Sequence, residues 1–173
     1  MKKALVVVDM NNDFVHDQGT LTCGEAGQKI VPYIIQLIND FQKDGHFVVF
    51  ANDHHQPDDE EFNVWPKHCV EGTWGAELFG ELKNLSAHVP LLKKTKYDAF
   101  YQTELEEMLR QQAVQEVHVV GVCTSICVYA TLQGAYFRGF RTVTHREGVG
   151  DFNPKAHDFA LEHVSNVFKT EVY

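Results

Sequence analysis

Short apolar runs alternate along this chain with longer segments in which apolar residues return every three or four positions. A short continuous apolar run is typical of a strand buried on both faces, and the periodic segments are typical of helices. The expected strands cover 3–9, 46–53, 88–94, 116–123, 140–146 and 167–173. The expected helices cover 27–46, 73–83, 103–112, 127–139 and 153–166.

Three of the expected helices begin with recognisable end signals. Pro32 suits the first turn of the helix over 27–46, where an N–H group would have no partner anyway. Thr103, with Glu106 three residues later, has the pattern of a capping box. Asn153 followed by Pro154 predicts an N-cap and the first residue of the last helix.

Strands that alternate with helices predict a parallel sheet, because the connection between two parallel strands crosses over one face of the sheet. We therefore expect a three-layer α/β fold with a six-stranded, mostly parallel sheet and helices on both faces. The chain has no internal repeat and no Pro/Gly/Ser-rich linker. One domain over 1–173 is the expected organisation.

Composition excludes several classes of protein. The chain is 44% hydrophobic and 23% charged, which is normal for a globular protein with a sizeable core. Its net charge of -9 argues against a nucleic-acid partner, since phosphate backbones bind clustered Lys and Arg. The apolar run 4–8 is too short for a signal peptide or a membrane span. We expect a cytoplasmic protein whose four cysteines are thiols.

Reactive side chains gather where the expected strands end. Asp9, Asp53, Lys94 and the segment 121–127 each lie at or just beyond the end of a different strand. In open parallel sheets, ligands bind beyond these carboxyl ends. Four reactive groups at one edge therefore point to a binding or catalytic site.

Each of these groups also has an ordinary structural interpretation. Cys127 lies in the first turn of a helix, where free N–H groups favour a thiolate, but it could equally be a small core residue. Cys123 is expected to be a buried core residue. Asp9 could act as a general base or as a turn carboxylate, and Lys94 as its cation or as a solvated side chain.

The segment 52–72 is rich in potential metal ligands. Asp53 and His55 lie at a strand end, and His68 follows a Trp-Pro pair. Two histidines with carboxylates suit zinc, manganese or iron, although an acidic surface loop has the same composition. Cys69 is a weaker candidate, because neighbours in an extended chain point in opposite directions.

The motifs resemble those of the nicotinamidase (pyrazinamidase) branch of the isochorismatase-like cysteine hydrolases. The matching motifs, in the family's order, are "VVVDMNNDF" (6–14), "DHH" (53–55), "WPKHCVEGTWGAEL" (65–78), "KTKYDAF" (94–100), "GVCTSICV" (121–128) and "EGVGDFNPKAH" (147–157). The resemblance implies a six-stranded parallel α/β fold, in agreement with the pattern above. Two departures are Ser125, where the family often has Asp, and His54, where Trp is common.

The resemblance implies a role for each residue at the sheet edge. Asp9, Lys94 and Cys127 would be catalytic, with Cys127 as the nucleophile. The backbone N–H groups of Cys123 and Cys127 would stabilise an oxyanion, after a cis peptide bond between Val122 and Cys123.

The resemblance also implies a metal site and a substrate pocket. One divalent ion would bind to Asp53, His55, His68 and Glu61, with Glu60 as the alternative to Glu61. Zinc is expected first, with manganese or iron as alternatives. The pyridine ring of the substrate would lie between aromatic walls, and these walls would be Phe14, Trp65 and Tyr97.

The implied activity is hydrolysis of nicotinamide to nicotinate and ammonia, as in NAD salvage, with pyrazinamide as a second substrate. Three alternatives stay open. Another amidase of the superfamily would keep Asp9, Lys94 and Cys127 without needing the metal ligands. An isochorismatase would need no cysteine nucleophile. A metal-binding or thiol-redox protein would use Cys123 and Cys127. The sequence does not fix the oligomeric state, and a homo-oligomer is compatible with it.

Overall fold

The computed structural model describes all residues, 1–173, around a six-stranded sheet in which every strand pairing is parallel. The strands follow the order β3-β2-β1-β4-β5-β6. Their bounds are β1 Lys3–Val8, β2 Phe47–Asp53, β3 Leu91–Lys94, β4 Glu116–Val122, β5 Arg141–Gly150 and β6 Glu171–Val172. The predicted α/β class is confirmed.

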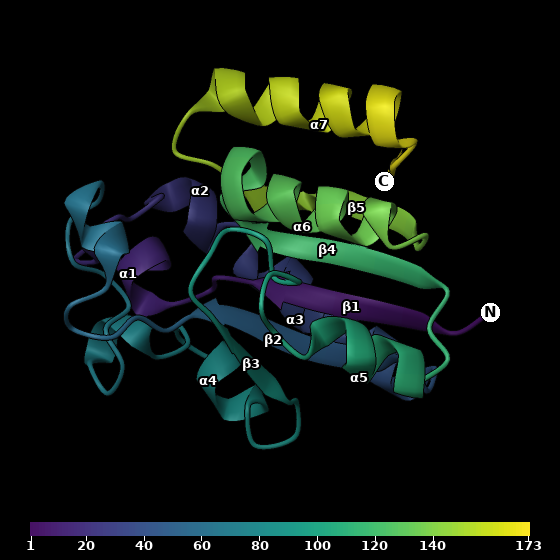
Figure 1. Cartoon of the computed structure of the whole chain (residues 1–173), viewed down its shortest axis with the longest axis horizontal. Coiled ribbons are helices and arrows are strands. Elements are labelled where there is room, and N and C mark those ends of the chain that lie inside the picture. The colour runs from purple at the N-terminus through teal and green to yellow at the C-terminus, as the bar shows by residue number, and fades with distance from the viewer.

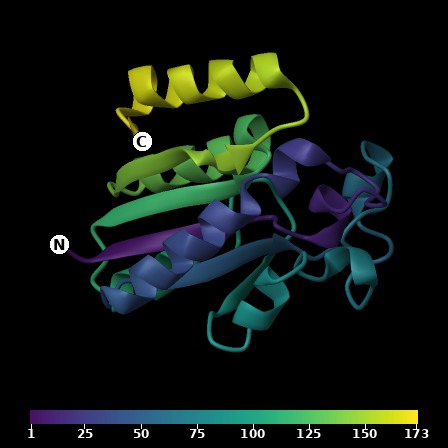
Figure 2. The same cartoon turned by 180° about the vertical axis from the view of Figure 1, so that it is seen from behind.

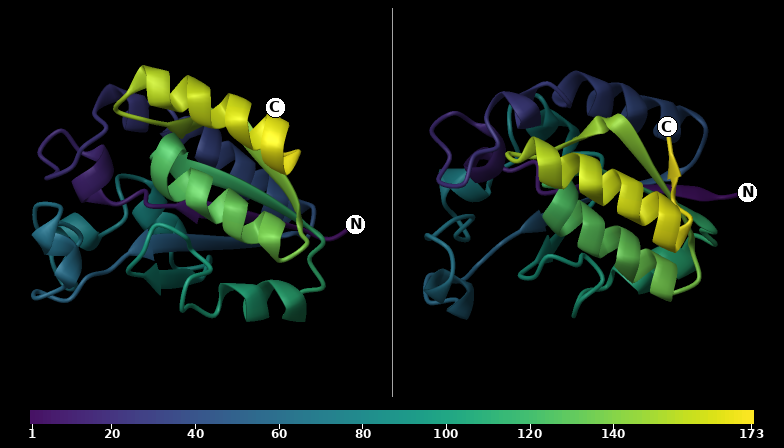
Figure 3. Two further views of the ribbon diagram at one scale, coloured as in Figure 1. Left: turned by 45° about the horizontal axis from the view of Figure 1, so that its top comes forward. Right: turned by 90° about the horizontal axis from the view of Figure 1, so that it is seen from above.

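Helices cover both faces of the sheet. Figure 1 shows α5, α6 and α7 on the near face, and Figure 2 shows α3 crossing the opposite face. The view from above in Figure 3 shows α7 running beside α6. The longer helices are α3 Val31–Lys43, α5 Leu105–Gln111, α6 Tyr129–Phe137 and α7 Pro154–Phe168. The short ones are α1 Asn12–Val15, α2 Glu25–Gln28, α4 Leu82–Leu85, the 3-10 turns η1 Glu60–Asn63 and η2 Trp74–Ala76, and the π turn η3 Thr124–Val128.

Two apolar cores lie on the two faces of β1. Ala4, Val6 and Val8 pack with residues of α5, α6 and α7, whereas Leu5 and Val7 pack with α3. All five side chains are fully buried, since β1 lies between β2 and β4. Burying one such aliphatic side chain contributes about 1.5–3 kcal/mol. This explains why 3–9 reads as a continuous apolar run.

Most of the predicted helix ends are confirmed, and one is wrong. Pro32 lies in the first turn of α3, and the Asn153 side chain accepts hydrogen bonds from the first N–H groups of α7. The helix expected from Thr103 begins instead after Glu104, which makes no side-chain cap. The Thr103 hydroxyl donates to the Ala99 carbonyl, and the Glu106 carboxylate pairs with arginines. The Thr103 hydroxyl also accepts from the Leu105 N–H at 3.3 Å. Because the Glu106 carboxylate pairs with arginines, the reciprocal bond of a capping box does not form.

The glycine-rich segments differ from the prediction. The single helix expected over 73–83 is two short helices, η2 and α4, separated by Gly80 with φ +55°. Strand β5 runs four residues beyond the expected end, through "EGVG". A side chain at Gly150 would meet the Ala26 carbonyl at 2.4 Å, so glycine lets α2 approach this strand closely. Strand β6 is only two residues long, because the rest of 167–173 belongs mainly to α7 and its end.

The one sheet uses strands from residue 3 to residue 172. The single domain over 1–173 stays a prediction. No helix has both the length and the apolar character that crossing a membrane requires.

Candidate active site

The candidate site lies where the strand order changes direction. Strand β1 is followed along the chain by β2 on one side, and β4 lies on its other side. The carboxyl ends of these strands point to the left in Figure 1, where α1, α2 and the segment 54–78 gather. Such a switch point is the usual ligand site of an open α/β sheet. Asp9 follows β1, Asp53 ends β2, Lys94 ends β3, and Cys127 lies in the turn after β4.

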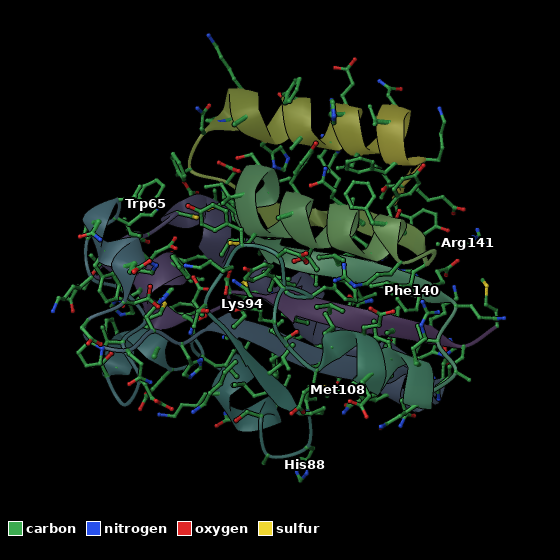
Figure 4. All side chains as sticks on the ribbon, in the orientation of Figure 1. Trp65, His88, Lys94, Met108, Phe140 and Arg141 are labelled. Carbon is green, nitrogen blue, oxygen red and sulfur yellow. The ribbon has the colours of Figure 1, made fainter.

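Lys94 is a buried cation shared by two buried carboxylates. Its Nζ donates a hydrogen bond of 2.7 Å to Oδ2 of Asp9 and another to Oδ1 of Asp53. The side chain of Lys94 is 0% exposed, so neither carboxylate competes with water for it. Asp53 and Lys94 are also register partners across β2 and β3, and this pairing sets their approach. Figure 4 shows Lys94 near the strand ends and Trp65 further out.

The environment separates the pKa values of the two carboxylates. Burial, together with the charge of Asp53, raises the pKa of Asp9 to about 6, against the opposing effect of Lys94. Burial also acts on Asp53, but Lys94 and His55 outweigh it and lower the pKa of Asp53 to about 2. The carboxylates hold the pKa of Lys94 above its usual range despite burial. Asp9 is therefore the group able to exchange a proton near neutral pH.

Cys127 lies in a single π turn against Asp9. The peptide bond between Val122 and Cys123 is cis, and Cys123 is the N-cap of the turn. The Cys123 carbonyl accepts from the N–H groups of Ile126 and Val128. Burial raises the pKa of Cys127, while Lys94 opposes that rise, and its thiol contacts the Asp9 side chain. A thiol in these surroundings needs a base to become a nucleophile.

Two side chains from other elements anchor this turn. Asp151, which follows β5, accepts from the Ser125 N–H at 2.8 Å and from its hydroxyl at 2.7 Å. The Thr124 hydroxyl and Nδ1 of His157 are 2.9 Å apart. The sequence motifs covered Asp151 and His157, but nothing in their spacing indicated these contacts.

Asp53, His55 and His68 form a buried cluster suited to a metal ion. Their ligand atoms all lie within 4.8 Å of one another. Nδ1 of His55 is held by Asp59 at 3.0 Å, and Nδ1 of His68 lies 2.7 Å from the Pro66 carbonyl. Both Nε2 atoms therefore face Asp53, and Nε2 of His55 is buried without a hydrogen-bond partner. This orphaned nitrogen, with partners fixing both imidazoles from behind, fits a divalent ion.

The fourth predicted ligand, Glu61, lies outside this close cluster. Glu61 lines the same cavity as His68, and its Oε2 is 3.2 Å from Nζ of Lys96. Glu60 is exposed and does not line the cavity. Of the two glutamates, Glu61 is thus the one near the cluster.

A cavity of about 370 Å³ connects the two sets of residues. Asp9, Cys123 and Cys127 line one part of it, and Asp53 and His68 another. The predicted aromatic residues Phe14, Trp65 and Tyr97 also line it, and the Trp65 indole donates to the Tyr97 hydroxyl at 3.0 Å. Lys94 and His55 are buried behind the wall. Lining residues that the sequence did not indicate are Thr20, Leu21, Thr22, Ile126 and Phe152.

Comparison with known proteins identifies close relatives along the whole chain. The isochorismatase domain model matches residues 3–172. An uncharacterised isochorismatase family protein of Bacillus subtilis, PncA, is 41% identical, over 99% of each chain. A crystal structure of nicotinamidase/pyrazinamidase PncA from Bacillus subtilis superposes with a TM-score of 0.96 at 42% identity, over 99% of each chain. The pyrazinamidase of Pyrococcus horikoshii in complex with zinc gives 0.92 at 31% identity, over 100% of this chain and 99% of that one.

Proposed function

Because this chain belongs to the isochorismatase domain family, we propose that it is a metal-dependent cysteine amidohydrolase that converts nicotinamide to nicotinate and ammonia. One observation carries the proposal. Asp9 and Cys127, with Lys94 buried behind them, line the same cavity as Asp53 and His68 of the candidate metal cluster. An amidase acting through the thiol alone would have no use for that second cluster.

The reaction begins at the thiol. Asp9 accepts the proton of Cys127, and Lys94 balances the negative charge that remains in the buried site. The thiolate attacks the carboxamide carbon, and the carbonyl oxygen becomes an oxyanion. The backbone N–H groups of Cys123 and Cys127 are the proposed donors to that oxyanion.

The same carboxyl group serves the later steps. Asp9 returns its proton to the departing ammonia, and a thioester on Cys127 remains. Asp9 then takes a proton from a water molecule that hydrolyses the thioester. A pKa of about 6 suits a group that must both take and give a proton near neutral pH.

The proposed metal ligands are Asp53, His55 and His68, with Glu61 as the fourth. When bound, the ion would supply a Lewis-acid site that holds the pyridine nitrogen and orients the ring. Zinc is the proposed ion, since it favours imidazole and carboxylate ligands and since the similar Pyrococcus horikoshii structure is a zinc complex. Phe14, Trp65 and Tyr97 are the proposed walls for the ring.

Ammonia release from nicotinamide by the purified protein tests the proposal. We expect turnover of nicotinamide and pyrazinamide, loss of turnover after chelation, and recovery with added zinc. An aliphatic carbamoyl compound should react poorly, because it lacks a ring for the aromatic walls. Preferential turnover of the carbamoyl compound, unaffected by chelation, would favour another amidase activity. A metal-binding or redox protein would release no ammonia from any of these compounds.

A further inference from the structure

Two cysteines outside the proposed mechanism lie in contact beside the cavity. Sγ of Cys23 is 3.1 Å from Sγ of Cys123, although the residues are 100 positions apart in the chain. Both side chains are buried, and both cysteines are free thiols. The proposed chemistry uses only the backbone N–H of Cys123 and no part of Cys23. The pair of thiols therefore has no assigned role.

The backbone holds each thiol in place. The N–H of Cys23 donates to the Phe14 carbonyl at 2.8 Å, and the next N–H, of Gly24, donates to the Thr22 hydroxyl at 2.9 Å. Cys123 directly follows β4, and its carbonyl is bound by the π turn. A disulfide needs its sulfurs about 2.05 Å apart, so an approach of about 1 Å suffices.

The two thiols connect two parts of the site. Residues 20–22, just before Cys23, line the cavity on one side. Cys123 lines the cavity itself and caps the turn that carries Cys127. A small reagent that enters the cavity can therefore reach the Cys123 sulfur first, with Cys23 directly behind it.

We propose that Cys23 and Cys123 form a redox modification site, at which a hydroperoxide converts the two thiols into a reversible disulfide that clamps segment 20–23 to the π turn. The Cys123 sulfur attacks the peroxide and becomes a sulfenic acid, releasing one molecule of water or alcohol. The Cys23 sulfur then attacks the sulfur of the sulfenic acid and displaces hydroxide. The hydroxide takes the proton of the Cys23 thiol and leaves as water. The thiols lose two electrons and two protons in total, and the peroxide bond is reduced.

The resting protein keeps the pair reduced. The hydrogen bond to Cys23, together with burial, raises the pKa of Cys123. Since the thiolate is the reacting form, oxidation is slow until a strong two-electron oxidant is supplied. An external dithiol restores the two thiols by exchange.

Hydrogen peroxide and intact-mass spectrometry test the site. The experiment uses a Cys127→Ser background, which removes the competing thiol of the proposed nucleophile. After peroxide, we expect the mass to fall by two hydrogen atoms, a linked peptide pair containing residues 23 and 123, and reversal by dithiothreitol. Hydrogen exchange over residues 20–24 should be slower in the oxidised form. Absence of the linked peptides, or equal exchange in both forms, would overturn the proposal.

Matched cysteine variants make the assignment specific. Cys23→Ser in the same background should lose the mass change. Cys69→Ala should keep it, because Cys69 is buried and its sulfur hydrogen-bonds to the Gly75 carbonyl, whereas Cys23 and Cys123 contact each other. If Cys23→Ser fails to fold, Cys123→Ser supplies the same control from the other side. A mass change that persists in either serine variant would contradict the assignment.

Discussion

The backbone N–H of Asp53 donates a hydrogen bond of 2.8 Å to Oδ1 of Asp9. The proposed general base and a proposed metal ligand are therefore joined directly, as well as through Lys94. Asp9 accepts this bond with a positive φ of 54°, a backbone region that few residues other than glycine adopt. Any substitution at Asp9 must keep an acceptor at Oδ1 if it is to leave the metal cluster undisturbed.

Asp9→Asn should abolish proton transfer by this side chain while keeping the local structure. Asparagine retains the Oδ1 acceptor for the Asp53 N–H, but its amide cannot take the Cys127 proton. We expect kcat/KM for nicotinamide to fall by about 10²–10⁴-fold or more, with the metal content unchanged. Steady-state kinetics and elemental analysis measure the two effects. A near-normal rate would remove Asp9 from the mechanism.

Lys94→Ala should cost both activity and stability. It leaves the carboxylates of Asp9 and Asp53 buried together without a cation, which destabilises a protein by about 3–5 kcal/mol. Urea unfolding and ammonia release measure the losses. Lys93→Ala is the matched control, because Lys93 lies on the same strand with an exposed side chain. Its effect should stay within about 0.5 kcal/mol, with normal turnover.

The double variant of Asp9→Asn and Lys94→Ala tests whether the two groups act as one unit. Groups that act together in one step are not additive, so the double variant should be little slower than the worse single variant. Rate losses that multiply would indicate two independent roles.

Cys127→Ala should abolish turnover while the fold and bound metal remain. The thiol is the proposed nucleophile, and the other thiol that lines the cavity, Cys123, is in contact with Cys23. Cys123→Ala is the matched control, since alanine keeps the backbone N–H that the mechanism uses. We expect substantial activity from Cys123→Ala, measured as ammonia release. An inactive Cys123 variant beside an active Cys127 variant would reverse the assignment.

His55→Ala and His68→Ala should each lose the bound metal. Each removes a buried imidazole from a cluster with no spare ligand of the same kind. Elemental analysis after dialysis measures the loss. His54→Ala is the control, because Nδ1 of His54 lies 3.3 Å from the Asn52 carbonyl and its side chain is not in the cluster. Full metal content in both cluster variants would refute the site.

Two neighbouring carboxylates refine the metal assignment. Asp59→Asn weakens the partner that holds Nδ1 of His55, and we expect metal affinity to fall by about 10–100-fold. Glu61→Gln should weaken binding, whereas Glu60→Gln should not, because only Glu61 lines the cavity. Titration with zinc against a competing chelator compares these variants. The opposite order for the two glutamates would make Glu60 the ligand.

A buried chain of polar groups should make stability depend on pH. His118 and His145 are 2.9 Å apart, and they continue to Glu116 and to the Tyr33 hydroxyl. Burial, with the nearby His118 and Lys3, lowers the pKa of His145 from 6.5 to about 4. Between these values the unfolded chain binds more protons than the folded one, so stability falls as the pH drops from 6.5 towards 4.

Urea midpoints across this pH range test the contribution of His145. His145→Asn should flatten the dependence relative to the parent protein. His88→Asn should leave it unchanged, since His88 is exposed on the turn at the bottom of Figure 4. An unaltered slope in the His145 variant would place the acid sensitivity elsewhere.

Sequence patterns predict those features that depend on repetition or on a helix end. The apolar runs located β1, β2 and β4, because a strand buried on both faces must be apolar on both. Asp9, Asp53 and Lys94 lie at the ends of successive strands. Because these strands are parallel, their ends meet at one edge of the sheet. The capping box at Thr103 was misread because the Glu106 carboxylate pairs with Arg138, a distant partner that only the folded chain brings near. The contacts of Cys23, Asp59 and Asp151 likewise depend on the conformation of loops, which periodic sequence patterns do not predict.

Lys94 is the last residue of the four-residue strand β3, which is an edge strand and pairs with β2 alone. A short edge strand opens by local unfolding at a lower free energy than the central strands β1, β2 and β4. Each opening withdraws the ammonium group from its two carboxylates while the bulk of the protein stays folded. Mild heating or low urea should therefore abolish activity reversibly before circular dichroism detects any unfolding. The loss of activity should thus occur at a lower temperature or urea concentration than global unfolding.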